Sequence, residues 1–289
     1  MAEVKEKKRK ESRFREVWRR LKKNKGAVIS LFLILALVLV AVFADYIAPY
    51  SYEEQNYEDS YAPHSAKHLL GADKLGRDVL SRLIYGARQS LMIGVFSVAI
   101  SAILGMFFGA LAGYYGGWVD NVLMRFLDIY QSIPMMLMCI VLSAVLGPSL
   151  RNTILALGIS MIPQFARLMR ASILPVREME YVEAAKSINA GNAHIIMKYI
   201  IPNAISPMIV SITMYIGSAI LIGAMMSFIG LGVQPPLPEW GTLISDARNV
   251  MRGHPTLSLY PGLCIMITVL AFNLLGDGLR DALDPRLKN

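Results

Sequence analysis

The apolar positions of the chain are gathered into six long runs. These runs lie at about 27–44, 90–113, 121–146, 152–171, 203–230 and 257–276, and each carries few charged residues or none. About 20 apolar residues in a row are enough to cross a bilayer core of roughly 30 Å as a helix. The pattern therefore predicts an all-α, polytopic membrane protein with six transmembrane helices.

The polar stretches between these runs contain shorter helical patterns. Residues 12–25 place Phe14, Val17, Trp18 and Leu21 at helical spacing among basic side chains. This arrangement is typical of an N-terminal amphipathic helix lying in the membrane interface. The long segment 45–88 ends in an amphipathic pattern that leads into the second run, and the segment 231–256 has room for one short helix.

Composition supports this interpretation, and charge gives the chain an orientation. The mean hydropathy is +0.46 and only 17% of the residues are charged. Twelve Lys or Arg and four Glu lie in residues 1–26, so this segment accounts for the whole net charge of +8. A basic tail that leads into an apolar span favours a cytoplasmic position beside anionic lipid over binding to nucleic acid.

Six spans then place both termini in the cytoplasm of a cell-membrane protein, and the segments 45–88 and 231–256 face outward. On this topology we expect four parts. Residues 1–26 form a basic cytoplasmic tail with the amphipathic helix, and residues 27–89 form the first span with an external loop. Residues 90–281 form the main transmembrane domain, and residues 282–289 form a second cytoplasmic tail.

A polar stretch, EYVEAAKSINAG, lies between the fourth and fifth runs and so on the cytoplasmic side. It predicts a short helix over about 177–188 and a second helical piece that begins near Asn192. Asn189 and Gly191 lie between the two pieces, and Asn and Gly most easily adopt left-handed backbone angles. We therefore expect a sharp turn here and a short helix lying off the bundle, with a small-residue face at Ala184 and Ala185.

This arrangement resembles the signature loop of ABC importer permeases, whose pattern is EAA, three residues, Gly, nine residues and Ile-x-Leu-Pro. Glu183, Ala184 and Ala185 match the start of the pattern, and Pro202 stands at its end. The three positions that depart from the pattern are Asn189 in place of the glycine, Tyr199 in place of the isoleucine and Ile201 in place of the leucine.

Three further segments resemble the C-type permease of dipeptide and oligopeptide importers. They are LLGADKLGRDVLSRLIYGARQSL at 69–91, SFIGLGVQPPLPEWGTLI at 227–244 and NLLGDGLRDALDPRL at 273–287. The resemblance covers nearly the whole chain. It implies a type I importer fold in which the short helix is a coupling helix that docks on a cytoplasmic ATPase.

The resemblance also implies the partners of the chain. These are a second homologous permease subunit, two ATPase subunits that hold ATP and Mg, and an extracytoplasmic substrate-binding protein. Di- or oligopeptides are the implied substrates, and similar permeases import nickel chelates, glutathione-like peptides or oligosaccharides. The rival hypothesis is a stand-alone secondary transporter or channel, but such proteins usually show internal repeats or ionisable residues near the bilayer midplane.

Other residues suggest roles inside the bundle. Gly105, Gly109 and Gly113 form two GxxxG steps, which predict close helix packing. Arg125 and Asp128 lie at i and i+3 in the third run, and they are either a structural or gate-stabilising pair or a contact for substrate. Methionines such as Met135 could line a permissive path or simply pack between helices.

Catalytic chemistry is not indicated. The chain contains no GxxxxGK[ST] phosphate loop and no Gly-Lys dipeptide, so we expect ATP hydrolysis on partner subunits and no cofactor on this chain. Its four histidines, His64, His68, His194 and His254, have no metal-binding spacing.

Overall fold

A computed structural model describes residues 13–283 of the chain, so residues 1–12 of the predicted tail 1–26 and residues 284–289 of the predicted tail 282–289 lie outside the described residues. The described part is built of helices, which confirms the all-α prediction. The chain begins with α1 (Arg13–Leu21) and α2 (Lys25–Val42), which match the predicted interfacial helix and first span. The segment predicted to be the external loop, and called the external loop below, follows with the short helix α3 (Ala44–Ile47) and a 3-10 turn at Tyr57–Asp59.

Helix α4 (Val79–Tyr115) joins the predicted amphipathic pattern and the second span into one helix of 37 residues. Asp78 begins it, because its carboxylate accepts a hydrogen bond of 2.8 Å from the backbone N–H of Ser81. At 1.5 Å per residue the helix is about 55 Å long, well above the roughly 30 Å of a bilayer core. Its first turns therefore extend beyond the membrane and pack with the external loop.

The third and fourth spans are each interrupted. Helices α5 (Gly117–Gln131) and α6 (Met135–Leu146) meet at 82°, just before Pro134, which disfavours helical geometry at the residue before it. Helices α7 (Leu150–Ser160) and α8 (Ile162–Arg177) are separated at Met161. The described residues therefore contain five helices able to cross a membrane, and six if the bent pair is one span.

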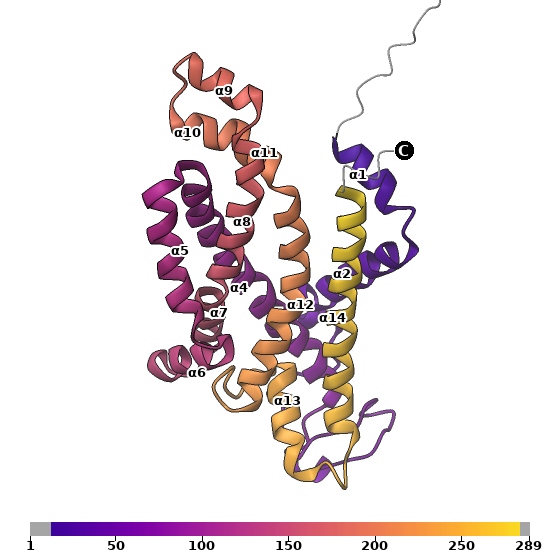
Figure 1. The fold of residues 1–289 in the computed structure, drawn as a ribbon. Coiled ribbons are helices and arrows are strands. Elements are labelled where there is room, and N and C mark those ends of the chain that lie inside the picture. The colour runs from indigo at the N-terminus through magenta and orange to yellow at the C-terminus, as the bar shows by residue number, and fades with distance from the viewer. Residues whose placement is uncertain (1–12, 284–289) are drawn as a thin grey trace, which may run out of the picture.

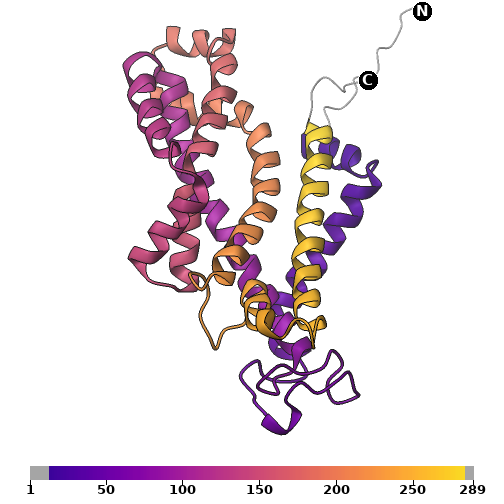
Figure 2. The same ribbon diagram turned by 60° about the horizontal axis from the view of Figure 1, so that its bottom comes forward.

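The remaining long elements are α12 (Ser206–Phe228), α13 (Trp240–Ala247) and α14 (Thr256–Leu283), with a 3-10 turn at Arg248–Val250. Helix α4 runs through the bundle and packs against α2, α5, α7, α8 and α12. Figures 1 and 2 show α9, α1 and the end of α14 at one end of the molecule. The external loop and α13 lie at the opposite end, as the predicted topology requires.

The glycines predicted to pack helices lie in the contact between α4 and α8. They are Gly105, Gly109 and Gly113, and each faces α8. A side chain at Gly109 would collide with the backbone carbonyl of Ala166, and a Cβ at Gly113 would lie 3.0 Å from the Cβ of Ile173. Because glycine lets two backbones approach closely, this stripe sets the distance between α4 and α8.

Candidate functional site

The chain segment between α8 and α12 forms a helical hairpin at the end of the bundle (Figure 1). Helix α9 (Glu180–Ser187) leads away from α8, and α10 (Asn192–Ile195) leads back. A π-helical turn at Ile196–Ile200 and the short α11 (Ile201–Ala204) connect it to α12. Pro202 lacks a backbone N–H and cannot continue regular helical hydrogen bonding, which accounts for the irregular turn just before it.

Asn189 makes the turn of this hairpin. Its φ is +57°, in the left-handed region expected from the sequence. The N–H of Asn189 donates to the carbonyl of Lys186 at 2.9 Å, and the N–H of Ala190 donates to the carbonyl of Ala185 at 3.1 Å. These two bonds form a Schellman motif, which ends α9 sharply. Gly191 has an ordinary φ of −62°. Of these two residues, Asn189 is therefore the one with left-handed backbone angles.

Helix α9 presents one charged face to its surroundings. Glu183 and Ala184 are exposed, whereas Val182 and Ala185 are buried against the rest of the hairpin and α8. The expectation that Ala184 and Ala185 share one accessible face was wrong, because successive residues of a helix point about 100° apart. In the described part of the chain, no hydrogen bond or ion pair holds the Glu183 carboxylate, which leaves it available to a partner.

Contacts with the end of α4 hold the hairpin in place. The hydroxyl of Tyr114 donates a hydrogen bond of 2.8 Å to Oδ1 of Asn192, and the Nζ of Lys186 lies 5.9 Å from the centre of the Tyr114 ring. The guanidinium of Arg177, at the end of α8, donates to the carbonyl of Gly113 at 3.0 Å. The end of α4 is therefore bonded both to the hairpin and to the end of α8.

The predicted pair of Arg125 and Asp128 is not formed. Asp128 instead accepts from the guanidinium of Arg167 on α8 at 2.8 Å, and Asp120 pairs with Arg170. The reason is that α5 and α8 run side by side, which brings cations of α8 within reach of the carboxylates on α5. Both ion pairs tie α5 to α8, and a role of Arg125 at a gate stays a prediction.

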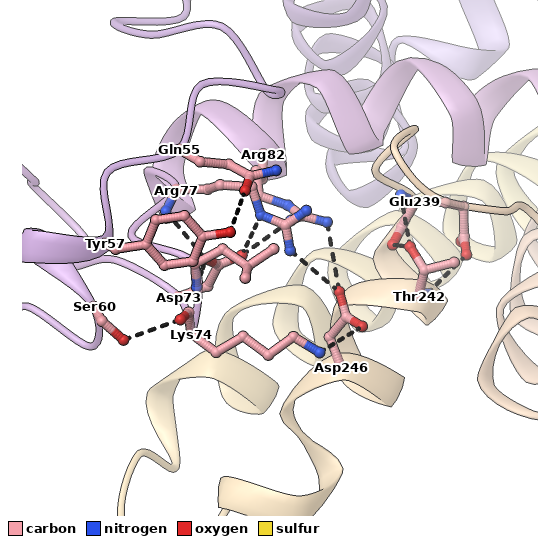
Figure 3. Close-up of polar contacts among 11 residues, drawn as sticks. Gln55, Tyr57, Ser60, Asp73, Lys74, Arg77, Arg82, Glu239, Thr242 and Asp246 are labelled. Carbon is pink, nitrogen blue, oxygen red and sulfur yellow. Dashed lines mark hydrogen bonds and ion pairs between the residues drawn. The ribbon is translucent and has the colours of Figure 1, made fainter.

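An ionic cluster that the sequence pattern did not predict lies between the external loop and α13, at the opposite end of the molecule. Figure 3 shows its contacts. The carboxylate of Asp73 accepts from Arg77 at 2.7 Å and from Arg82 at 2.9 Å. Both arginines also lie 3.6 Å from the carboxylate of Asp246 on α13. Burial raises the pKa of Asp246, although the nearby charge of Lys74 acts in the opposite direction. The cluster joins the external loop to α13, and the charged sequence DKLGRD just before α4 was the available signal.

Glu239 fixes the start of α13. Its carboxylate is fully buried and accepts from the N–H of Thr242 at 3.1 Å and from the hydroxyl of Ser90 at 2.9 Å. Burial raises the pKa of Glu239. The indole N–H of Trp240 donates to the carbonyl of Leu83 at 3.1 Å, so α13 is held on α4 by two adjacent residues. The described residues contain no group of three or more His, Cys, Asp or Glu able to hold a metal ion.

Two protein-family models match parts of the chain. Residues 105–289 match the model of the binding-protein-dependent transport system inner membrane component. Residues 12–63 match the model of the N-terminal TM domain of oligopeptide transport permease C. The second match covers α1, α2 and the start of the external loop.

Curated relatives are similar along almost their whole length. The dipeptide transport system permease protein of Alkalihalophilus pseudofirmus is 44% identical over 278 residues, which covers 96% of this chain and 91% of the relative. A glutathione transport system permease protein of Pectobacterium atrosepticum is 43% identical, with 96% and 92% covered. The di/tripeptide transport system permease protein of Pseudomonas aeruginosa is 44% identical, with 96% and 94% covered.

Solved structures share the fold at low sequence identity. An inward-facing form of the MetNI methionine ABC transporter has a TM-score of 0.58 and 18% identity, covering 70% of this chain and 96% of that one. An amino acid ABC transporter has a TM-score of 0.54 and 17% identity, covering 68% and 92%. The chain belongs to the family of binding-protein-dependent transport system inner membrane components, the multi-pass permease subunits of ABC importers.

Proposed function

We propose that this permease forms half of the translocation pathway for di- or oligopeptides and couples it to ATPases through α9. The observation that carries the proposal is the hairpin of α9 and α10. It stands at one end of the bundle, is closed by the turn at Asn189 and exposes the unpaired carboxylate of Glu183. A second, homologous permease completes the pathway, two ATPase subunits bind ATP and Mg, and a substrate-binding protein delivers the peptide.

Rigid attachment lets the hairpin transmit motion. Asn192 is bonded to Tyr114 at the end of α4, and Arg177 joins the end of α8 to the same place. Movement of an ATPase docked on α9 is therefore passed to the α4–α8 pair, whose backbones are in close contact at the glycine stripe. The ion pairs between α5 and α8 attach a third helix, α5, to the α4–α8 pair.

A peptide substrate is supported by relatives named for dipeptide, di/tripeptide and glutathione transport. Dipeptides, tripeptides and glutathione are all peptides or peptide-like molecules. A short peptide is therefore the first candidate substrate, and a glutathione-like tripeptide is the second. Nickel chelates and oligosaccharides rank below them. A stand-alone secondary transporter is disfavoured because the α9 hairpin would then have no partner.

The proposed docking of an ATPase on α9 sets the orientation of the chain in the membrane. An ATPase site requires the hairpin, α1 and the end of α14 to be cytoplasmic, and the external loop then faces outward. Labelling with an impermeant thiol reagent in intact cells tests this, because Glu54 and Ile188 are exposed at opposite ends. Glu54→Cys should react and Ile188→Cys should react only after lysis. The reverse result would contradict the orientation.

Uptake by the reconstituted complex tests the function. Proteoliposomes with both permeases, both ATPases and the binding protein should accumulate a labelled dipeptide only when ATP is present. Glu183→Arg should reduce uptake, since charge reversal on an exposed docking face opposes association. Asp281→Arg, the same reversal on the exposed end of α14, is the control and should retain uptake. Equal uptake by both variants would exclude Glu183 from coupling.

A further inference from the structure

The interruptions of the third and fourth spans lie side by side and line a partly open pocket. The first interruption covers residues 132–134 between α5 and α6, and the second lies at Met161 between α7 and α8. The cavity between them has a volume of about 230 Å³. Its lining residues are Tyr130, Gln131, Ile133, Pro134, Met135, Met138, Ser160, Pro163 and Gln164.

The pocket lies far from the hairpin end along the helix axes, which follows from distances along α5 and α8. Gln131 ends α5, about 21 Å from its start at Gly117, and Gln164 lies about 20 Å before the end of α8 at Arg177. Both starting points are at the hairpin end of the molecule, so the pocket lies in the outer half of a bilayer core of roughly 30 Å. Non-helical backbone at such depth occurs where it is buried in protein or lines a cavity.

Gln164 carries a hydrogen-bonding atom with no partner. Its side-chain Oε1 is buried and accepts no hydrogen bond within the described part of the chain, while its Nε2 lies 3.9 Å from the sulfur of Met135. The hydroxyl of Tyr130 is also buried beside Ser160, outside normal hydrogen-bond geometry. An unpaired buried acceptor costs free energy, so a ligand that brings a hydrogen-bond donor into the pocket is favoured there.

We propose that this pocket binds one peptide group of the transported peptide during its passage. The lining contains no charged side chain, which excludes it as a site for the charged peptide termini. The Oε1 of Gln164 accepts from the peptide N–H, and the thioethers of Met135 and Met138 adapt to side chains of different shape. Broken helices beside a cavity form the substrate sites of other transporters. The inference rests on the proposed peptide-import function.

Gln164→Leu separates a substrate role from a structural one. It removes the amide but keeps a side chain of similar length, so the unpaired acceptor disappears. Uptake at low peptide concentration should fall about two- to tenfold, the range for loss of one hydrogen bond between uncharged groups. The unfolding temperature of the complex should stay the same or rise. A lower unfolding temperature with normal uptake per folded complex would show a structural role and overturn the proposal.

Ser172→Ala is the matched control on the same helix. The hydroxyl of Ser172 donates to the carbonyl of Leu168 within α8 and does not line the pocket. This variant should retain wild-type uptake. A loss equal to that of Gln164→Leu would show that α8 is generally sensitive to substitution and would contradict a specific role of the pocket.

An ester analogue of the peptide identifies the bond itself. Replacing the central peptide N–H by oxygen removes the donor that Gln164 is proposed to accept. After correction for the measured affinity of the binding protein, wild type should transport the ester several-fold more slowly than the peptide, and Gln164→Leu should transport both at similar rates. Equal discrimination by both permeases would overturn the proposal. Absence of peptide uptake by wild type would instead disprove the proposed function.

Discussion

Tyr114 and Asn192 lie 78 residues apart in sequence, yet the hydroxyl of one donates a 2.8 Å hydrogen bond to the side-chain oxygen of the other. Tyr114 is in the last turn of α4 and Asn192 begins α10. The bond joins the long central helix to the hairpin that we propose as the docking element. A displacement of the hairpin is therefore transmitted to the centre of the bundle.

Tyr114→Phe should weaken this connection without unfolding the protein. The substitution keeps the ring and removes a hydrogen bond worth about 0.5–1.5 kcal/mol. We expect fewer peptides to be transported per ATP hydrolysed, at nearly unchanged complex yield. Tyr115→Phe is the control, since Tyr115 is half exposed on the next position of the helix. An unchanged ratio of transport to hydrolysis in Tyr114→Phe would contradict a coupling role for the bond.

Asn189 should tolerate glycine and reject valine. Glycine adopts the observed φ of +57° without strain, whereas a β-branched residue there costs roughly 1–2 kcal/mol or more. Because Asn189 is exposed and remote from the buried bundle, the strain acts on the hairpin. For equal amounts of permease in the membrane, less ATPase should co-purify with Asn189→Val than with wild type. Asn189→Gly should match wild type. Equal recovery for valine would disprove the importance of the turn.

Gly109→Ala should destabilise the bundle, whereas Gly262→Ala should not. A methyl group at Gly109 would overlap the carbonyl of Ala166 and force α4 and α8 apart. Overpacking of this kind destabilises a folded protein by about 1–3 kcal/mol. Gly262 lies within α14 with open space around it, and alanine is the better helix former there by about 1 kcal/mol. Thermal unfolding in detergent compares the two. Similar unfolding temperatures would show that the close contact can relax.

Glu239→Gln should preserve the attachment of α13, and Glu239→Ala should not. Since burial raises the pKa of Glu239, a neutral amide suits the site, and its oxygen can still accept from the N–H of Thr242. Alanine leaves the helix uncapped, which costs about 0.5–2 kcal/mol, and leaves the hydroxyl of Ser90 without its acceptor. Protease resistance of the external segment is the measurement. Greater damage from glutamine than from alanine would contradict this explanation.

Local patterns in the sequence predicted the apolar spans, the interfacial helix and the turn at Asn189, but not the breaks in the third and fourth spans. Apolar run length and the backbone preference of Asn are properties of neighbouring residues, so they can be read without the fold. The partner of Asp128 could not be, because Arg167 comes within reach only when α5 and α8 pack together. The same holds for the cluster of Asp73 and Asp246, which joins segments distant in sequence. It also holds for the Oε1 of Gln164, because its burial depends on how the helices pack.

The central claim is that α9 contacts an ATPase subunit, and a photo-crosslinker placed at Ala184 tests it most directly. Ala184 is exposed beside Glu183, and Gln55 is an exposed control at the opposite end of the molecule. In the purified, assembled transporter, light should produce a covalent product that contains both the permease and an ATPase subunit from the Ala184 position and none from the Gln55 position. Failure of the Ala184 position to crosslink an ATPase, in a complex that still hydrolyses ATP and imports peptide, would contradict the claim.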